Sequence, residues 1–279
     1  MRRLAFALLL VLAGCGGPSD VESLGWLAMG TTAQLSFKTA EGPCAANESL
    51  AFGKVKETFE EVERKLSIWR PDSEISRYVS LDQVSPETRP CYEAAFALMR
   101  ETEGAFNPRW RGPKTLDLGA IAKGFAVDIA AGMPSQDTDM LIDLGGNVKA
   151  LRGDWRTGVK DPNGGGFAAV VDLHEGEALA TSATYYRGSH IYDGRTGLAV
   201  SNGVASVTVL CRSAMWADGL STTLFILGPE AGRAFVEEKC PLFMPDCDAL
   251  PDGKYAAVLW ILSDGRQVKL DPDSRFSAR

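Results

Sequence analysis

The sequence predicts an α+β fold, and two observations favour that class. Segments with strand-like patterns come in clusters, and segments with helical periodicity lie between the clusters rather than alternating with single strands. A regular strand–helix alternation would instead predict a parallel α/β sheet. Beyond the N-terminal segment, roughly 255 residues are enough for one large domain with an ample core. We therefore expect a single large α+β domain.

Hydrophobic periodicity places the elements along the chain. Apolar residues recur at helical spacing in residues 50–66, and a second helical segment, residues 92–102, stops at Gly104. Residues 115–132 indicate a strand end, a glycine turn and a helix, and residues 217–227 indicate another helix. Apolar runs bounded by turn-forming residues predict strands at 29–37, 140–142, 148–159, 168–173, 178–181 and 205–210, followed by a hairpin of 256–262 and 267–270.

The N-terminus has the pattern of an export signal. Two arginines precede an apolar run over residues 4–13, which is too short to span a bilayer stably. Residues 12–15 resemble the bacterial lipobox, whose cysteine becomes lipidated; the alternative is an ordinary signal peptide that happens to contain Cys15. We expect residues 1–14 to be removed, residues 15–25 to form a flexible tether, and residues 26–279 to form the domain. The lipid on Cys15 would then hold the protein to a bacterial membrane in the cell envelope, facing the periplasm or the exterior.

Charge and cysteine usage limit the range of functions that the sequence allows. The 36 acidic residues outnumber the 29 basic ones, and no basic stripe is present, so we expect no nucleic-acid partner. Five cysteines follow Cys15 without the paired spacing of a zinc site. In an oxidising compartment Cys240 could pair with Cys247 and Cys44 with Cys91, whereas Cys211 lies in an apolar strand and is expected to be a buried free thiol.

Three segments carry residue types suited to chemistry on a phosphorylated ligand. Residues 116–128 place an acidic residue, a glycine turn and Lys123 at a strand–helix junction, where backbone N–H groups can meet a polyphosphate. Asp218, Ser221 and Thr222 share one face of the helix over 217–227, and their oxygens suit Mg²⁺. Taken alone, they are equally consistent with a helix cap and with hydroxyls bonded to preceding carbonyls.

His190 is the third candidate. It is one of two histidines and stands among turn formers and charged residues, where an imidazole can accept a proton from a substrate. The alternative is a surface-loop histidine bonded to a neighbour. The other histidine, His174, is expected to be a turn residue.

These segments and several others resemble the motifs of the ApbE family, the FAD:protein FMN transferases, and they follow one another along the chain in the family's order. Residues 213–228 are similar to the family's metal-binding helix, and residues 185–197 to its histidine motif. Shorter matches are the Met-Gly-Thr of residues 29–31, the Leu-Ser-Ile-Trp of residues 66–69, the Gly-Ala-Phe-Asn-Pro of residues 104–108 and the Gly-Gly-Asn of residues 145–147. The resemblance covers residues 26 to 228.

The resemblance implies a fold with a central FAD cleft and a specific set of site residues. It assigns the catalytic base to His190. It assigns Mg²⁺ to the Ala120 carbonyl, Asp218, Ser221 and Thr222. It assigns FAD contacts to Met29, Trp69, Ala105, Phe106, Asn107, Asp117, Lys123 and Tyr192.

Four residues depart from the family's pattern. Asn107 stands where the family has aspartate, which removes a charge near the flavin, and Trp69 replaces a tyrosine. Ala183 replaces the glycine of a Thr-Ser-Gly motif. Gly194 replaces the proline after Asp193, and we expect it to loosen the loop beside His190.

The function implied by the resemblance is Mg²⁺-dependent transfer of FMN from FAD, its substrate, to a threonine hydroxyl of an acceptor protein, with release of AMP. The acceptor would be a subunit of a membrane redox complex that carries a threonine flavinylation motif. The alternatives are an envelope lipoprotein that binds FAD or hydrolyses it to FMN and AMP without a protein acceptor, and a solute-binding lipoprotein with an unrelated ligand.

Overall fold

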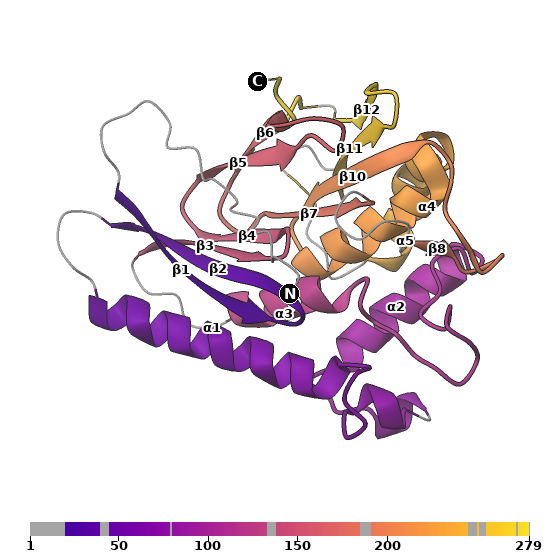
Figure 1. Ribbon diagram of the computed structural model, residues 1–279, viewed down its shortest axis with the longest axis horizontal. Helices are drawn as coiled ribbons and strands as arrows, with labels where there is room; N and C mark the ends of the chain where they lie inside the picture. Colours follow the sequence, from indigo (N-terminus) through magenta and orange to yellow (C-terminus); the bar gives the residue numbers. More distant parts are fainter. Residues whose placement is uncertain are drawn as a thin grey trace, which may run out of the picture.

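One antiparallel sheet of eight strands organises the molecule (Figure 1). The computed structural model describes residues 20–39, 45–78, 80–132, 138–184, 191–244, 250, 255–271 and 273–278. The strands follow one another across the sheet in the order β1 (Asp20–Ala28), β2 (Thr31–Thr39), β3 (Asp139–Leu144), β4 (Asn147–Arg152), β7 (Ala178–Ala183), β10 (Val204–Cys211), β11 (Ala257–Leu262) and β12 (Gln267–Leu270). Helices and strands combine in the α+β manner expected from the clustered strand patterns.

The sheet separates two hydrophobic cores. Successive residues of β3 point to opposite faces, so Ile142 joins one core and Leu141 the other. Helices α1 (Ala45–Leu66), α2 (Arg89–Glu101), α3 (Ala122–Ala131) and α4 (Ala214–Glu238) contribute to the first core. The hairpin β5 (Trp155–Lys160) and β6 (Phe167–Leu173) covers the second core together with Phe276 near the C-terminus. The predicted site residues at the start of α3 and on α4 therefore belong to the helical side of the sheet.

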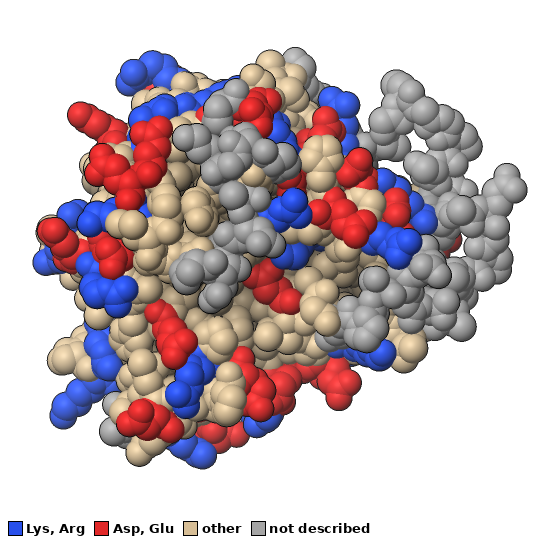
Figure 2. Space-filling view, turned by 180° about the vertical axis from the view of Figure 1, so that it is seen from behind, with Lys and Arg blue, Asp and Glu red and all other residues tan. Residues whose placement is uncertain are grey.

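The remaining elements are short. Two 3-10 turns, η1 (Ile75–Arg77) and η2 (Leu81–Gln83), connect α1 to α2. A two-stranded ribbon of β8 (Tyr192–Asp193) and β9 (Leu198–Ala199) precedes β10, and α5 (Cys240–Phe243) follows α4. Within the described ranges, no helix is both long and apolar enough to cross a bilayer. On the face shown in Figure 2, acidic and basic side chains intermingle.

Two boundaries expected from the sequence are wrong. Residues 20–25, expected in the tether, form most of β1, whose Trp26 ring lies 4.9 Å from Phe52 and 5.8 Å from Phe59 of α1. The strand expected over 148–159 is broken into β4 and β5. Gly153 makes that break because its φ is +69° and a Cβ there would lie 2.1 Å from the Asp139 carboxylate.

The cysteines only partly follow expectation. Cys91 is a buried free thiol, so the predicted Cys44–Cys91 disulfide is wrong, and burial raises the pKa of its thiol above the usual range. Cys211 is buried in β10 as expected, and its thiol donates to the Ser213 carbonyl at 3.0 Å. Cys44 and Cys247 lie outside the described residues.

Asp143, at the end of β3, predicts a pH-dependent stability. Burial raises the pKa of its carboxyl to about 6, although the Gly146 N–H, which donates to Oδ1 at 2.8 Å, opposes the shift. The folded state thus holds this proton more tightly than the unfolded chain does. The resulting stabilisation is complete below pH ~4 and is lost as the pH rises through about 6.

We therefore expect Asp143→Asn, which cannot ionise, to become progressively more stable than the wild type between pH ~4 and ~7. The gain at pH ~7 should be about 1–2 kcal/mol. Urea denaturation of both proteins over this pH range measures it. A difference in the free energy of unfolding that does not vary with pH would contradict the prediction.

Candidate functional site

The start of α4 is fixed by a side chain of α3. The Asp128 carboxylate accepts hydrogen bonds from the Ser213 hydroxyl at 2.7 Å, the Ala214 N–H at 3.0 Å and the Met215 N–H at 2.9 Å. The Lys149 ammonium donates to the same carboxylate at 2.9 Å. Asp128 thus satisfies N–H groups that the first turn of a helix leaves without partners, and it places its negative charge at the positive end of α4.

A glycine lets the two helices meet backbone to backbone. A Cβ on Gly124 would lie 2.0 Å from the Ala214 carbonyl oxygen and 2.8 Å from the Asp218 Cβ, so only glycine fits. The Gly124 N–H donates to Asp218 Oδ2 at 3.1 Å. Among the described residues, no hydrogen bond ends on the Ala120 carbonyl, the acceptor that this N–H would have one turn earlier. The close approach therefore leaves a carbonyl oxygen available beside α3.

Lys123 and Asp218 form the charged centre of the site. The Lys123 ammonium lies 3.1 Å from Asp218 Oδ1 and 3.2 Å from Oδ2, and it also donates to the Gly119 carbonyl at 3.2 Å. The Asp218 side chain is 6% exposed and the Lys123 side chain 23%. Two residues predicted separately, one for phosphate and one for metal, are thus in direct contact.

The predicted hydroxyls cluster on the next turn of α4. Ser182, at the end of β7, lies 2.8 Å from the Ser221 hydroxyl and 3.1 Å from the Thr222 hydroxyl. Ser221 also donates to the Asp218 carbonyl at 2.9 Å, the local bond considered as an alternative from the sequence. Ser182 was missed as a site residue, although it stands in the Thr-Ser motif that signals this place.

Asp117 is bound to Arg111, which lies against an aromatic group that includes Trp69 and Trp110. The Asp117 carboxylate accepts from Arg111 Nε at 2.8 Å and from the Gly119 N–H at 2.9 Å. The Arg111 guanidinium lies 4.4 Å from the Trp110 ring and 5.9 Å from the Trp69 ring. Trp69 is 81% exposed, as a side chain available to stack on a ligand would be.

Tyr192 of β8 completes this group. Its ring stacks on Trp110 with a centroid distance of 4.5 Å and an interplanar angle of 11°. The predicted FAD contacts Trp69, Asp117 and Tyr192 are therefore linked through Trp110 and Arg111. The motifs gave no signal for either linking residue.

Two other predicted FAD contacts have buried side chains. Ala105 is 0% exposed and Phe106 is 3% exposed, and both belong to the helical-side core. Met29 has a left-handed φ of 49°, and its N–H donates to Glu63 Oε2 at 2.9 Å. A turn that places Met29 in this strained conformation fixes where β1 ends and β2 begins.

Asn107 and Gly194, two departures from the family pattern, are in contact. A Cβ on Gly194 would lie 2.2 Å from the Asn107 Cβ and 2.4 Å from the Gly104 carbonyl oxygen. The Gly194 N–H donates to the Ala105 carbonyl at 2.9 Å, a bond that proline cannot make. Gly194 itself is held by this hydrogen bond and by close packing, whereas residues 185–190, in the loop that it was expected to loosen, lie outside the described residues. His190 lies outside the described residues.

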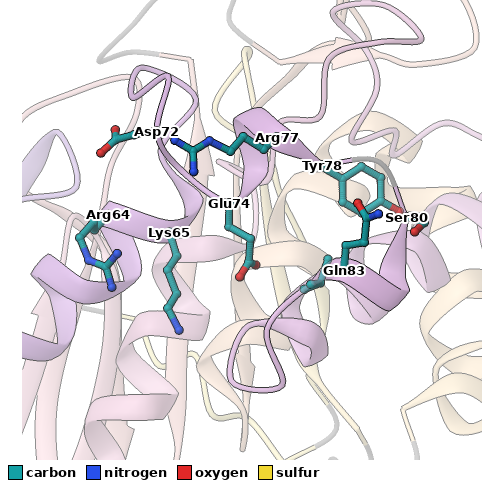
Figure 3. A pocket seen from close by; sticks show the side chains of 9 residues that line it. Arg64, Lys65, Asp72, Glu74, Arg77, Tyr78, Ser80 and Gln83 are labelled. Atoms are coloured by element: carbon teal, nitrogen blue, oxygen red, sulfur yellow. The ribbon is translucent and has the colours of Figure 1, made fainter.

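A polar cavity of about 360 Å³ lies elsewhere, between the end of α1 and the turns η1 and η2 (Figure 3). None of the predicted site residues lines it. Its lysine and one of its arginines pair with acidic neighbours: Lys65 with Glu61 and Glu87, and Arg64 with Glu61. We assign this cavity no role in the chemistry.

The donor set around Asp218 fits a hard divalent cation. In the described part of the chain no three His, Cys, Asp or Glu residues form a metal cluster. A metal held here would therefore combine one carboxylate, the free Ala120 carbonyl and hydroxyl oxygens with oxygens of a ligand. Oxygen donors of this kind suit Mg²⁺, which binds through one or two carboxylates plus phosphates.

Fold and side chains together define an α+β protein with a charged, oxygen-rich site between α3 and α4 and an aromatic group presenting Trp69. The family model described as "ApbE family" matches residues 29–113 and 111–244, and the chain belongs to that family. The resemblance inferred from the motifs is confirmed.

Relatives and solved structures agree with this assignment. A protein of Vibrio cholerae named FAD:protein FMN transferase is 30% identical, over 86% of this chain and 92% of that protein. A protein of Haemophilus influenzae with the same name is 26% identical, over 84% and 89%. The structure of the flavin transferase ApbE from Vibrio cholerae is similar with a TM-score of 0.72 at 25% identity, over 93% of this chain and 98% of that one. The ApbE protein from Thermotoga maritima has the same fold, with a TM-score of 0.74 at 23% identity over 93% and 100%.

We expect Asp128→Ala to lower the free energy of unfolding by about 2–4 kcal/mol, because it removes the α4 cap and leaves Lys149 without its carboxylate. Asp172→Ala, at an exposed ion pair with Arg156, is the control and should change stability by less than about 0.5 kcal/mol. Urea denaturation compares them. Equal changes in the free energy of unfolding for the two substitutions would show that the cap stabilises the fold no more than an exposed ion pair does.

Proposed function

We propose that this protein transfers FMN from FAD to a threonine hydroxyl of an acceptor protein and releases AMP, in a reaction that depends on Mg²⁺. Family membership and the names of the relatives support the flavin transfer. One observation supports the metal part of the proposal: Lys123 contacts Asp218, and the Ala120 carbonyl, one turn before the Gly124 N–H that binds Asp218, accepts no hydrogen bond from the described residues. This grouping suits a diphosphate and a divalent cation held side by side.

Different residues would bind the metal, compensate the charge of the phosphates and accept the proton. Asp218, the Ala120 carbonyl, Ser221 and Thr222 would hold Mg²⁺, which when bound neutralises charge on the diphosphate. Lys123 would add a positive charge beside the phosphates. His190 would take the proton of the threonine hydroxyl as its oxygen bonds to the FMN phosphorus. The bond from that phosphorus to the bridging oxygen breaks, and AMP leaves with this oxygen.

The aromatic group would orient the substrate. Trp69 offers an exposed ring on which the flavin can stack, and Tyr192 presents a ring held flat against Trp110. Fixing the ring system at one end and the diphosphate at the other would hold the phosphorus in one place for attack.

The proposed location follows from the N-terminal pattern. A lipid on Cys15 would leave only residues 16–19 between the membrane and β1, because β1 begins at Asp20. Four residues span at most about 14 Å. The domain would therefore stay close to the envelope membrane, where a membrane redox subunit with a threonine motif is within reach.

A second function remains as the alternative. In this alternative the protein only binds FAD or hydrolyses it to FMN and AMP without a protein acceptor, and Asn107 favours it because the residue lacks the charge of the family's aspartate. A soluble form beginning at Gly16 separates the two when it is incubated with FAD, Mg²⁺ and a threonine-bearing acceptor domain. Mass spectrometry of the acceptor shows a gain of FMN for a transferase, whereas FMN and AMP without labelling indicate a hydrolase. Intact bound FAD indicates a binding protein, and absence of binding contradicts the proposal.

We expect Asp218→Asn to reduce acceptor labelling by about 100-fold or more, because the only charged metal ligand is lost. Labelling as a function of Mg²⁺ concentration measures the effect. Asp172→Asn, an exposed carboxylate on β6, is the control and should retain the wild-type dependence. Wild-type labelling in the Asp218 variant would place the metal elsewhere.

We expect His190→Ala to keep FAD binding and to lose about 100-fold or more in transfer, because general-base catalysis contributes rate rather than affinity. The chain offers a matched control, since its other histidine, His174, is exposed and pairs with Asp154 at 3.0 Å. His174→Ala should transfer FMN at the wild-type rate. Fluorescence titration of FAD and the labelling rate separate binding from chemistry. If both variants transfer equally well, His190 is not the base.

A further inference from the structure

The Lys123 ammonium uses all its hydrogen-bonding capacity at this site. It donates to both oxygens of Asp218 and to the Gly119 carbonyl, and an ammonium has three protons to give. The contact with Asp218 joins residues 95 positions apart, so it is set by the packing of α3 on α4 and not by local sequence. Lys123 thus acts as the counterion of Asp218.

Asp218 depends on such a partner. Its side chain is 6% exposed, and its only other donor to the carboxylate among the described residues is the Gly124 N–H. A buried carboxylate without a positive partner is strongly disfavoured. A ligand that displaces the Lys123 ammonium from Asp218 must therefore supply a positive charge to the carboxylate itself.

A divalent cation approaching Asp218 alone meets this ammonium. Two positive groups would then share one carboxylate at contact distance, and at that range their repulsion is large in a partly buried site. The diphosphate of a dinucleotide changes this balance because it adds two negative charges. The flexible stem of Lys123 allows its ammonium to move from the carboxylate to a phosphate oxygen, which leaves Asp218 to the metal.

We propose that Lys123 is an internal counterion that keeps the divalent cation off Asp218 until a diphosphate arrives, and so couples metal binding to substrate binding. The inference rests on the proposed function, in which metal and FAD share this site. By linkage, each ligand raises the affinity for the other by the same factor. The metal is then taken up together with FAD and is held weakly by the protein alone.

The first test measures metal binding without any nucleotide. Mn²⁺ serves as the probe, and electron paramagnetic resonance counts the free ion in titrations of the full protein. We expect Lys123→Met to bind Mn²⁺ about tenfold more tightly than the wild type, because the competing charge is gone. Lys123→Arg keeps the charge and should bind as weakly as the wild type. Lys114→Met removes an exposed lysine elsewhere and controls for the change in net charge.

The second test measures the coupling itself. ADP-ribose, a stable diphosphate diester, is added to the same titrations. We expect it to raise the affinity of the wild type for Mn²⁺ about tenfold, and to raise that of Lys123→Met much less, because its metal site is already accessible. Circular dichroism confirms that each variant is folded, and the wild-type titrations alone test the coupling if a variant is not.

The outcomes separate the inference from the proposed function. Equal Mn²⁺ affinity of the wild type and Lys123→Met overturns the counterion role while leaving the metal site in place. Equal enhancement by ADP-ribose in both proteins also overturns it. If no protein binds Mn²⁺ even with ADP-ribose, the metal site of the proposed function fails, and the inference fails with it.

Discussion

The cap that Asp128 provides is the constraint on which the site depends. One carboxylate of α3 holds the first N–H groups of α4 and a partly buried lysine of β4, so the two helices and the sheet meet in a single register. Sliding α4 by one residue would turn Asp218 by about 100° around the helix axis, away from Lys123. Gly124 is required for the same register, because a Cβ at this position would push α3 and α4 apart. A single cross-helix cap therefore determines which side chains of α4 face α3.

The same packing creates the unusual polar groups of the site. The Gly124 N–H turns to a side chain of α4, and this leaves the Ala120 carbonyl without its normal helical partner. Both carboxylates placed here, Asp117 and Asp218, are neutralised by a cation from the same site. The protein thus supplies each of these carboxylates with a counterion of its own, and in the proposed function a bound diphosphate would draw Lys123 away from Asp218. Structural stability and readiness to bind anions arise from the same ion pairs.

Much of the fold was predictable because its signals are local, and much of the site was not because its contacts are long-range. Helical spacing located α1, α2 and α4, and the motifs supplied Asp117, Lys123 and Asp218. β1 was missed because an edge strand buries only part of its residues, so Leu24 and Leu27 remain exposed and blur the alternation. Trp110 and Arg111 act through neighbours brought together by folding, and no spacing in the sequence reports such contacts. Ser182 stands in a recognisable Thr-Ser motif, but its contacts with Ser221 and Thr222 also depend on the packing of β7 against α4. Lys123 and Asp218 were both identified, but their contact follows only from the packing of α3 on α4.

The departures at Asn107 and Gly194 lie side by side in the structure. Asn107 directs its side-chain oxygen to the Arg109 N–H at 2.8 Å, while its Cβ fills the space that a side chain at position 194 would need. Proline at 194 would both collide there and remove the N–H that binds the Ala105 carbonyl. The glycine therefore fixes the backbone next to Asp193, whose carboxylate is bound by Arg195 at 2.6 Å. Tyr192, with its stack on Trp110, stands just before this anchored point, so the backbone contacts of Gly194 help to hold the aromatic group in position. Restoring proline alone would accordingly disturb the Tyr192 side of the site, and the residue at 107 would have to adjust with it.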